Sequence, residues 1–261
     1  MINHNFKKKY GQNFITDINL LNAIVKDAQI TANDDVLEIG AGAGTLTEVL
    51  SNTAKKVVSY EIDSDLQNAL LSLDLQNTRF VFKDIMKEPL EKIEEDFVGE
   101  YKMVANLPYY ITTPIIFKFL NNSKKLDSLT IMVQKEVAQR MIAKSGDDDY
   151  GVLSIMIEFY GQASITRIVS RKMFYPQPNV DSAIVHLQIE RNKYPDIDKD
   201  KFYKFIQICF SMKRKTLKNN LSHGYGFSSN MLEEKLGKEI LEKRAENFDI
   251  DQLLKIFKKL F

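Results

Sequence analysis

The segment VLEIGAGAGTLTEVL, residues 36–50, places three glycines directly between an apolar run and a helical pattern. The apolar run fits a short buried strand, and the residues after the glycines carry apolar side chains at helical spacing. Gly40, Gly42 and Gly44 allow a ligand to approach the backbone closely, and they leave the amides at the start of the helix free. The segment therefore predicts a strand, a tight loop and a helix that form one wall of a binding site.

Predicted strands and helices alternate along most of the chain. The strands are expected at 34–39, 56–63, 78–85, 101–107, 126–134 and 182–190, and the helices at 18–29, 44–54, 64–73 and 114–122. Residues 150–169 fit a helix followed by a strand, although their periodicity is ambiguous. Alternation of this kind favours an α/β fold, with a parallel sheet covered by helices on both faces.

The composition changes near the polar stretch RNKYPDIDKD, residues 191–200, which contains Pro195. We place a domain boundary there, with a first domain at 1–192 and a helical C-terminal domain at 193–261. Residues 199–261 hold 14 Lys or Arg against 8 Asp or Glu, whereas the other residues hold 22 against 27. A basic segment on a mildly acidic body suggests a polyanionic partner, although a solvated charged domain would look the same.

Several classes of protein are disfavoured by composition. The apolar runs are shorter than the roughly 18–20 residues of a membrane span, and the N-terminus has no apolar core of a secretory signal. The one cysteine, Cys209, cannot form an internal disulfide, and the three histidines are scattered, so we expect neither a disulfide framework nor a metal site. The sequence thus favours a cytoplasmic, metal-free protein, which we expect to be a monomer.

Acidic residues end the strands beside the glycine loop. Glu61 closes the second strand, where a carboxylate can accept both hydroxyls of a ribose. Asp84 lies at the end of the third strand, where it can meet an adenine amino group, while Glu38 fits an ordinary strand-end charge equally well. The loop has no basic residue for a pyrophosphate, so the pattern suits a nucleoside without phosphates, such as S-adenosylmethionine. A structural turn is the alternative.

The segment VANLPYYITTP, residues 104–114, places an asparagine, a Leu-Pro pair and aromatic residues at the end of the fourth strand. In open α/β sheets, ligands bind beyond the carboxyl ends of the strands. The amide oxygen of Asn106 and the carbonyl oxygen of Leu107, held by Pro108, could accept both N–H groups of an exocyclic amine, and Tyr109 could stack on its base. Such positioning would direct the nitrogen lone pair at a methyl donor without a general base.

Several blocks together resemble one family, the KsgA/Dim group of ribosomal RNA adenine dimethyltransferases. The blocks are KKYGQNFITD, EIGAGAGTLTE, NLPYY, VQKEVAQRM and FYPQPNVDSAIV, and they run from Lys8 to about Leu221. The resemblance implies a Rossmann-like class I methyltransferase domain with a small helical C-terminal domain. It also implies S-adenosylmethionine as cofactor, and dimethylation of N6 on two adjacent adenosines in a hairpin near the 3′ end of small-subunit ribosomal RNA. A pre-30S particle would be the partner.

The same resemblance assigns further residues to the site. Asn13 and the backbone of Ile15 would contact the donor, together with Gly40, Glu61, Asp84 and Asn106. Phe174 would face Tyr109 across the target base, although the pattern alone makes Phe174 a core residue. The family usually has leucine where Ile15 stands and proline where Ala41 stands, so we expect a slightly looser glycine turn and unchanged binding.

Basic residues occur in two clusters. In FSMKRKTLKNNL, residues 210–221, we expect one helix that presents Arg214, Lys215 and Lys218 away from its apolar stripe, with Lys213 unexplained on that stripe. Near the N-terminus, Lys7, Lys8 and Lys9 lie beside the predicted donor-covering block. Both clusters suit contacts with RNA phosphates, and a solvated helix face is the alternative for the first. The three aspartates at 147–149 receive no role.

Two other functions remain open. Erm-type methyltransferases act on large-subunit ribosomal RNA, but their acceptor block usually has isoleucine at the position of Leu107, and DNA adenine methyltransferases tend to have proline there. The second alternative is a binding protein without catalysis, acting in ribosome assembly or transcription. The intact block from Asn106 to Tyr109 argues against a pure loss of activity.

Overall fold

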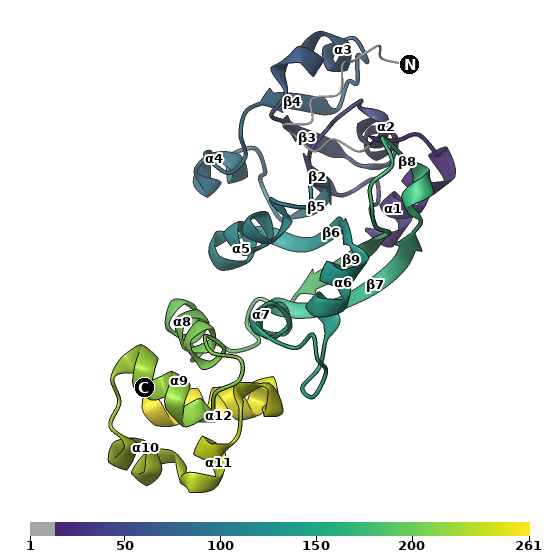
Figure 1. Cartoon of the computed structure of the whole chain (residues 1–261). Coiled ribbons are helices and arrows are strands. Elements are labelled where there is room, and N and C mark those ends of the chain that lie inside the picture. Colours follow the sequence, from purple (N-terminus) through teal and green to yellow (C-terminus); the bar gives the residue numbers. More distant parts are fainter. Residues whose placement is uncertain (1–13) are drawn as a thin grey trace. The chain divides into compact units, whose positions relative to one another are not determined.

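A computed structural model describes residues 14–261. These residues form two compact units (Figure 1). The first comprises the described residues up to Ala138 together with Ala163–Ile189, and the second comprises Gln139–Gln162 and Glu190–Phe261. In the part of the chain so described, no helix is both long and apolar enough to span a membrane.

The first unit contains the strands and the helices that connect them. The strands are β1 (Phe14–Ile15), β2 (Asp35–Ile39), β3 (Lys56–Glu61), β4 (Thr78–Phe82), β5 (Tyr101–Asn106), β6 (Leu126–Gln134), β7 (Gly161–Val169, which begins in the second unit), β8 (Phe174–Tyr175) and β9 (Ser182–Ile189). The helices are α1 (Ile18–Asp27), α2 (Thr45–Thr53), η2 (Ser64–Leu66), α3 (Gln67–Leu71), α4 (Leu90–Glu94), α5 (Thr112–Asn122), η3 (Arg171–Met173) and α6 (Lys135–Ile142, which ends in the second unit).

Seven of these strands form one sheet in the order β4-β3-β2-β5-β6-β9-β7. The pairs β4–β3, β3–β2, β2–β5 and β5–β6 are parallel, as the alternation of strands and helices predicts. Strand β9 pairs with β6 antiparallel, a reversal that the sequence pattern did not reveal. The short strands β1 and β8 form a separate antiparallel pair. The predicted α/β fold class is confirmed.

The five inner strands of the sheet, β3, β2, β5, β6 and β9, are buried along most of their length, whereas the edge strands β4 and β7 are more exposed. Val36, Val57 and Val104 pack in one core cluster with apolar side chains of α1 and α2. Their neighbours Leu37 and Val58 point to the other face, because side chains alternate along a strand, and are also buried. Continuous burial of this kind is typical of a parallel sheet between helices.

The register of the parallel strands brings three chain segments together at the carboxyl edge of the sheet. Ile39, the last residue of β2, pairs with Tyr60 on one side and with Ala105 on the other. Gly40 therefore leaves the sheet between the ends of the neighbouring strands, where Glu61 and Asn106 follow Tyr60 and Ala105. The fold thus places the glycine loop between the predicted ribose acceptor and the predicted amine acceptor.

The second unit is helical. Its helices are α7 (Val152–Tyr160), α8 (Lys199–Cys209), α9 (Leu217–Tyr225), α10 (Ser229–Leu236), α11 (Lys238–Glu242), η4 (Ala245–Asn247) and α12 (Ile250–Leu260). Aromatic rings form much of its core: the Phe202 ring centroid lies 4.9 Å from that of Phe159 and 5.4 Å from that of Phe257. Residues 139–162, which the sequence analysis places in the first domain, pack with these C-terminal helices. The boundary at 192/193 stays a prediction.

The prediction of one helix through residues 210–221 is wrong. Helix α8 ends at Cys209 and α9 begins only at Leu217, so a turn separates them. The Asn220 side-chain oxygen accepts hydrogen bonds from the Ser211 hydroxyl (3.1 Å) and the Met212 amide (3.0 Å), which stabilises this turn. The turn also accounts for Lys213, which is exposed and donates to the Asp148 carbonyl oxygen (3.2 Å).

Candidate active site

The glycine loop lies close against its neighbours. Gly40, Gly42 and Gly44 have φ values of 88°, 55° and 80°, a region that side chains with a Cβ rarely adopt. A Cβ on Gly40 would lie 3.1 Å from the Asn106 carbonyl oxygen, and one on Gly42 would lie 3.0 Å from the Phe14 ring. Both the dihedral angles and the available space therefore require glycine here.

Glu61 joins the end of β3 to the glycine loop. One carboxylate oxygen accepts a hydrogen bond from the Gly42 amide and the other from the Asp63 amide, both at 2.8 Å. Burial raises the pKa of Glu61, whereas these amide donors act in the opposite direction. Each carboxylate oxygen has more than one lone pair, so Glu61 can still accept a hydrogen bond from a ligand hydroxyl.

Glu38 lies beneath the loop and is not a solvated strand-end charge. The side chain is fully buried, and one oxygen accepts hydrogen bonds from the Thr47 hydroxyl of α2 (2.6 Å) and the Ser59 hydroxyl of β3. Burial raises its pKa to about 7, and the negative charge of Glu61 adds to this effect. Glu38 therefore connects β2, α2 and β3 beneath the candidate site.

Asp84 begins the turn that follows β4. Its carboxylate accepts a hydrogen bond from the Met86 amide (3.0 Å), and its carbonyl oxygen accepts one from the Lys87 amide (3.0 Å). Asp84 and the buried Ile85 both line the same pocket as the glycine loop. The turn thus forms a wall of the pocket, as predicted from its position at a strand end.

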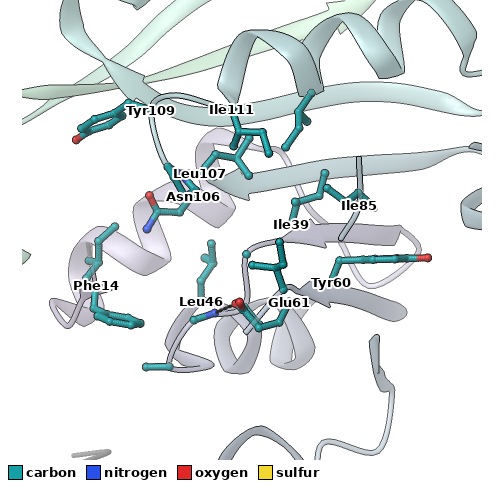
Figure 2. A pocket seen from close by; sticks show the side chains of 18 of the residues that line it. Phe14, Ile39, Leu46, Tyr60, Glu61, Ile85, Asn106, Leu107, Tyr109 and Ile111 are labelled. Atoms are coloured by element: carbon teal, nitrogen blue, oxygen red, sulfur yellow. Dashed lines mark hydrogen bonds between the residues drawn. The ribbon is translucent and has the colours of Figure 1, made fainter. Parts of the chain in front are cut away.

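The Asn-Leu-Pro-Tyr block continues from β5 along the opposite wall. Figure 2 shows Asn106, Leu107 and Tyr109 on one side of the pocket and Glu61 on the other. The carbonyl oxygen of Pro108 accepts a hydrogen bond from the Ile111 amide (3.1 Å), so the block ends in a tight turn. The Tyr109 hydroxyl lies 2.8 Å from the buried Ser182 hydroxyl of β9, which fixes the direction of the ring.

Strands β1 and β8 complete the pocket. Ile15 pairs with Phe174, both side chains are buried, and both residues line the pocket. The Ile15 carbonyl oxygen accepts a hydrogen bond from the Thr45 hydroxyl at the start of α2 (3.1 Å), which ties β1 to the glycine loop. Phe174 is only 5% exposed, so little of its ring is open for stacking on a base.

The pocket encloses about 1070 Å³ of space, part of which is open to solvent. It brings together the predicted residues Ile15, Gly40, Glu61, Asp84, Asn106, Leu107, Pro108, Tyr109 and Phe174. The carboxylate, the apolar walls and the glycine backbone fit S-adenosylmethionine, because its ribose and adenine need acceptors and flat apolar surfaces.

Of the predicted basic residues, those that the structure describes are not among the residues that line this pocket. Lys7, Lys8, Lys9 and Asn13 lie outside the described residues. Arg214 and Lys215 are exposed in the turn between α8 and α9, whereas Lys218 forms an ion pair with Glu233 (2.8 Å) within the second unit. Among residues 14–261 there is no cluster of three or more potential metal ligands.

Three features of the site were missed from the sequence. Ser182 contacts Tyr109 across 73 residues, a separation at which no local pattern reports a contact. Tyr110 lines the pocket with a ring that is 67% exposed, and Glu38 is buried below the loop. The doubled tyrosine of NLPYY was the available signal for Tyr110, because a second ring beside the first seldom packs in the same core.

The open α/β sheet and the pocket beyond its strand ends define a nucleoside-binding enzyme of the class I methyltransferase type. The ribosomal RNA adenine dimethylase family model matches residues 3–260, so the chain belongs to this family, as the sequence blocks predicted. The crystal structure of a dimethyladenosine transferase from Plasmodium falciparum is similar, with a TM-score of 0.80, 30% identity and coverage of 95% of this chain and 98% of that one. The 23S rRNA methyltransferase ErmE has a TM-score of 0.67, 26% identity and coverage of 95% and 99%.

Curated relatives are more similar in sequence. Ribosomal RNA small subunit methyltransferase A of Clostridioides difficile (strain 630) is 44% identical over 230 residues, which is 86% of this chain and 79% of the relative. The protein of the same name from Mycoplasma mobile is 41% identical over 263 residues, covering 100% of this chain and 98% of the relative. The similarity thus extends through the C-terminal helices.

Proposed function

We propose that this protein dimethylates N6 of adenosine in small-subunit ribosomal RNA, with S-adenosylmethionine as the methyl donor. We further propose that the targets are two adjacent adenosines in a hairpin near the 3′ end, presented in a pre-30S particle. One observation carries the proposal: the Asn106–Tyr109 block shares a pocket with the glycine loop and Glu61. The names of the curated relatives support the small subunit as the source of the RNA.

The donor is held by residues at the ends of the first three parallel strands, β2, β3 and β4. Glu61 accepts hydrogen bonds from the ribose hydroxyls, Asp84 accepts one from the adenine amino group, and Gly40 lets the backbone approach. S-adenosylmethionine supplies a methyl carbon made electrophilic by its positive sulfur. The buried apolar walls, among them Ile39 and Leu46, exclude water from this region.

The acceptor is held by the other wall. The Asn106 side-chain oxygen and the Leu107 carbonyl oxygen each accept one N–H of the target N6, which holds the nitrogen lone pair toward the methyl carbon. Pro108 fixes the backbone that carries the second oxygen, and Tyr109, fixed by Ser182, stacks on the base. As the nitrogen–carbon bond forms, the carbon–sulfur bond of the donor would break and S-adenosylhomocysteine would leave. The N6–H group becomes acidic in this step, so its proton can leave to water without a dedicated base.

Partial burial favours the neutral, protonated form of the Tyr109 phenol. Partial burial raises the pKa of its phenol, although the hydrogen bond with Ser182 opposes the shift. A neutral ring is the appropriate partner for a neutral base, because stacking needs no charge. The buried Phe174 adds to the apolar wall, and the exposed Tyr110 is placed to meet the RNA as it enters.

The first alternative is action on large-subunit ribosomal RNA. Purified protein with labelled S-adenosylmethionine should modify isolated 30S particles, and mass mapping should find N6,N6-dimethyladenosine at two adjacent positions. Naked large-subunit RNA should remain unmodified. Modification of the large-subunit RNA alone would assign the chain to the Erm-type function, and no modification of either RNA would favour a binding protein without catalysis.

We also propose that the protein is a monomer located in the cytoplasm.

A further inference from the structure

Lys118 of α5 reaches from the acceptor wall to the donor wall of the first unit. Its ammonium group donates hydrogen bonds to the backbone carbonyl oxygens of Ile85, Met86 and Glu88, at 2.5 to 3.3 Å. These carbonyls belong to the turn that begins at Asp84. One lysine side chain therefore satisfies three acceptors of a turn that has no sheet partner for them.

Lys118 is partly buried, and acidic residues surround its ammonium group. Burial lowers the pKa of Lys118, and the nearby Asp84, Glu88 and Glu91 oppose that shift. Other charged contacts of the turn are more exposed: Lys83 is 57% and Lys87 is 84% exposed where they pair with Glu88 and Asp84. Exposed pairs contribute little, so the three charge-assisted bonds of Lys118 restrain the turn together with its internal hydrogen bonds to Asp84.

The position of Lys118 on α5 makes this restraint relevant to the site. Helix α5 begins at Thr112, directly after the block that carries Asn106 and Tyr109, and the turn carries Asp84 and Ile85 of the donor wall. The ammonium group thus holds the adenine side of the pocket against the helix that follows the acceptor block. A shift of this turn would move the wall against which the nucleoside packs.

We propose that Lys118 is a positioning residue for the methyl donor: it holds the turn at 84–88 in the shape that binds the adenine ring. The inference rests on the proposed function, since it takes this pocket as the donor site. Lys118 does not touch the donor in this account. It acts through the backbone of Ile85 and through Asp84.

The test compares Lys118→Met with a matched control at the other edge of the sheet. Lys125 also caps backbone carbonyls with its ammonium group, donating to Glu94 (3.0 Å) and Phe97 (2.6 Å), but it lies outside the pocket lining. Calorimetry with S-adenosylhomocysteine gives Kd, thermal unfolding gives Tm, and steady-state assays separate KM from kcat. Lys118→Met should raise Kd and the KM for S-adenosylmethionine roughly tenfold or more, with kcat within about threefold of wild type.

Lys125→Met should lower Tm at least as much as Lys118→Met and leave Kd unchanged. Lys118→Arg retains N–H donors and should recover Kd to within about threefold of wild type. Unchanged Kd in Lys118→Met, or equal losses of affinity in Lys118→Met and Lys125→Met, would overturn the inference. Failure of the wild-type protein to bind S-adenosylhomocysteine would instead refute the proposed function.

Discussion

The two edges of the central sheet use the same kinds of side chain in different ways. At the amino edge, where β5 and β6 begin, the Glu94 carboxylate accepts hydrogen bonds from the Tyr101 hydroxyl (3.3 Å), the Ser123 hydroxyl and the Lys125 amide (3.2 Å). Near the start of β4, the Asn77 amide donates to carbonyl oxygens of Ser51 (2.8 Å) and Ala54 (3.0 Å). These polar groups are satisfied within the protein.

At the carboxyl edge, a carboxylate and an asparagine again end the strands, but they face a pocket. Glu61 is held by two backbone amides, and Asn106 lies beside Gly40 with its side chain at the pocket wall. The difference lies in the backbone: left-handed glycines and a proline turn the chain away, so that these side chains line a pocket. Similar residues therefore stabilise the fold at one edge and line the proposed binding site at the other.

The largest expected effect is a loss of methyl transfer in Asn106→Ala that Asn77→Ala should not show. Asn106→Ala should lower kcat for methyl transfer by about 100- to 1000-fold, because one of two acceptors for the target amine is lost. Its Kd for S-adenosylmethionine should stay within about threefold of wild type. Asn77→Ala should leave kcat unchanged and lower the thermal midpoint. Equal losses of transfer and donor affinity in Asn106→Ala would contradict its role as amine acceptor.

The amino edge should respond in stability alone. Glu94→Ala leaves two hydroxyls and an amide without their buried acceptor, so the free energy of unfolding should fall by about 3 kcal/mol in urea denaturation. Calorimetry at a temperature where the variant is folded should give a wild-type Kd for S-adenosylhomocysteine. A large loss of donor affinity would show that the two edges are not independent.

Glu38 provides a pH test of the carboxyl edge. Because burial raises its pKa from the ordinary 4.5 to about 7, the folded protein holds a proton that the unfolded chain releases over this range. The stabilising contribution is full below pH 4.5 and is lost as the pH rises through about 7. Between pH 5.5 and 8 the loss amounts to about 2 kcal/mol.

Glu38→Gln should remove this dependence, which urea denaturation of both proteins at the two pH values will measure. The relevant quantity is the difference between the proteins, since other groups titrate equally in both. A variant with the same change in stability between pH 5.5 and 8 as wild type would assign the dependence to other groups.

The smallest expected effect concerns the basic turn of the second unit. Arg214→Glu with Lys215→Glu should weaken binding to 30S particles about fivefold to tenfold at 0.15 M salt, and should reduce the salt dependence of binding. Lys201→Glu is the matched control, because Lys201 is an exposed lysine of the same unit that pairs with Asp198 (3.5 Å). Filter binding across a salt series distinguishes the two variants. Identical binding curves for wild type, the double variant and Lys201→Glu would show that the turn is a solvated surface without a role in RNA binding.

Local sequence patterns were sufficient to predict the strands and the residues at their ends. Apolar runs, the glycines and the acids at strand ends located β2, β3 and β5, and parallel pairing then brought Glu61 and Asn106 together. The antiparallel pairing of β9 was not predictable, because a buried strand has the same pattern in either direction.

Contacts between segments that are distant in the sequence could not be predicted from local sequence patterns either. The Tyr109–Ser182 contact and the carbonyl contacts of Lys118 depend on how whole elements pack. The expected helix at 210–221 failed because the buried Asn220 side chain accepts hydrogen bonds from Ser211 and Met212 and thereby stabilises a turn. Thr216, whose hydroxyl caps α9, was the local signal that a new helix begins there.

A crystal structure of the protein with S-adenosylhomocysteine would test the central claim most directly. The ribose hydroxyls should lie within hydrogen-bond distance of the Glu61 carboxylate, the adenine should lie against Asp84 and Ile85, and the Asn106 side-chain oxygen should face the sulfur across an open space. A nucleoside bound elsewhere, or a sulfur turned away from Asn106, would contradict the assignment of the two walls.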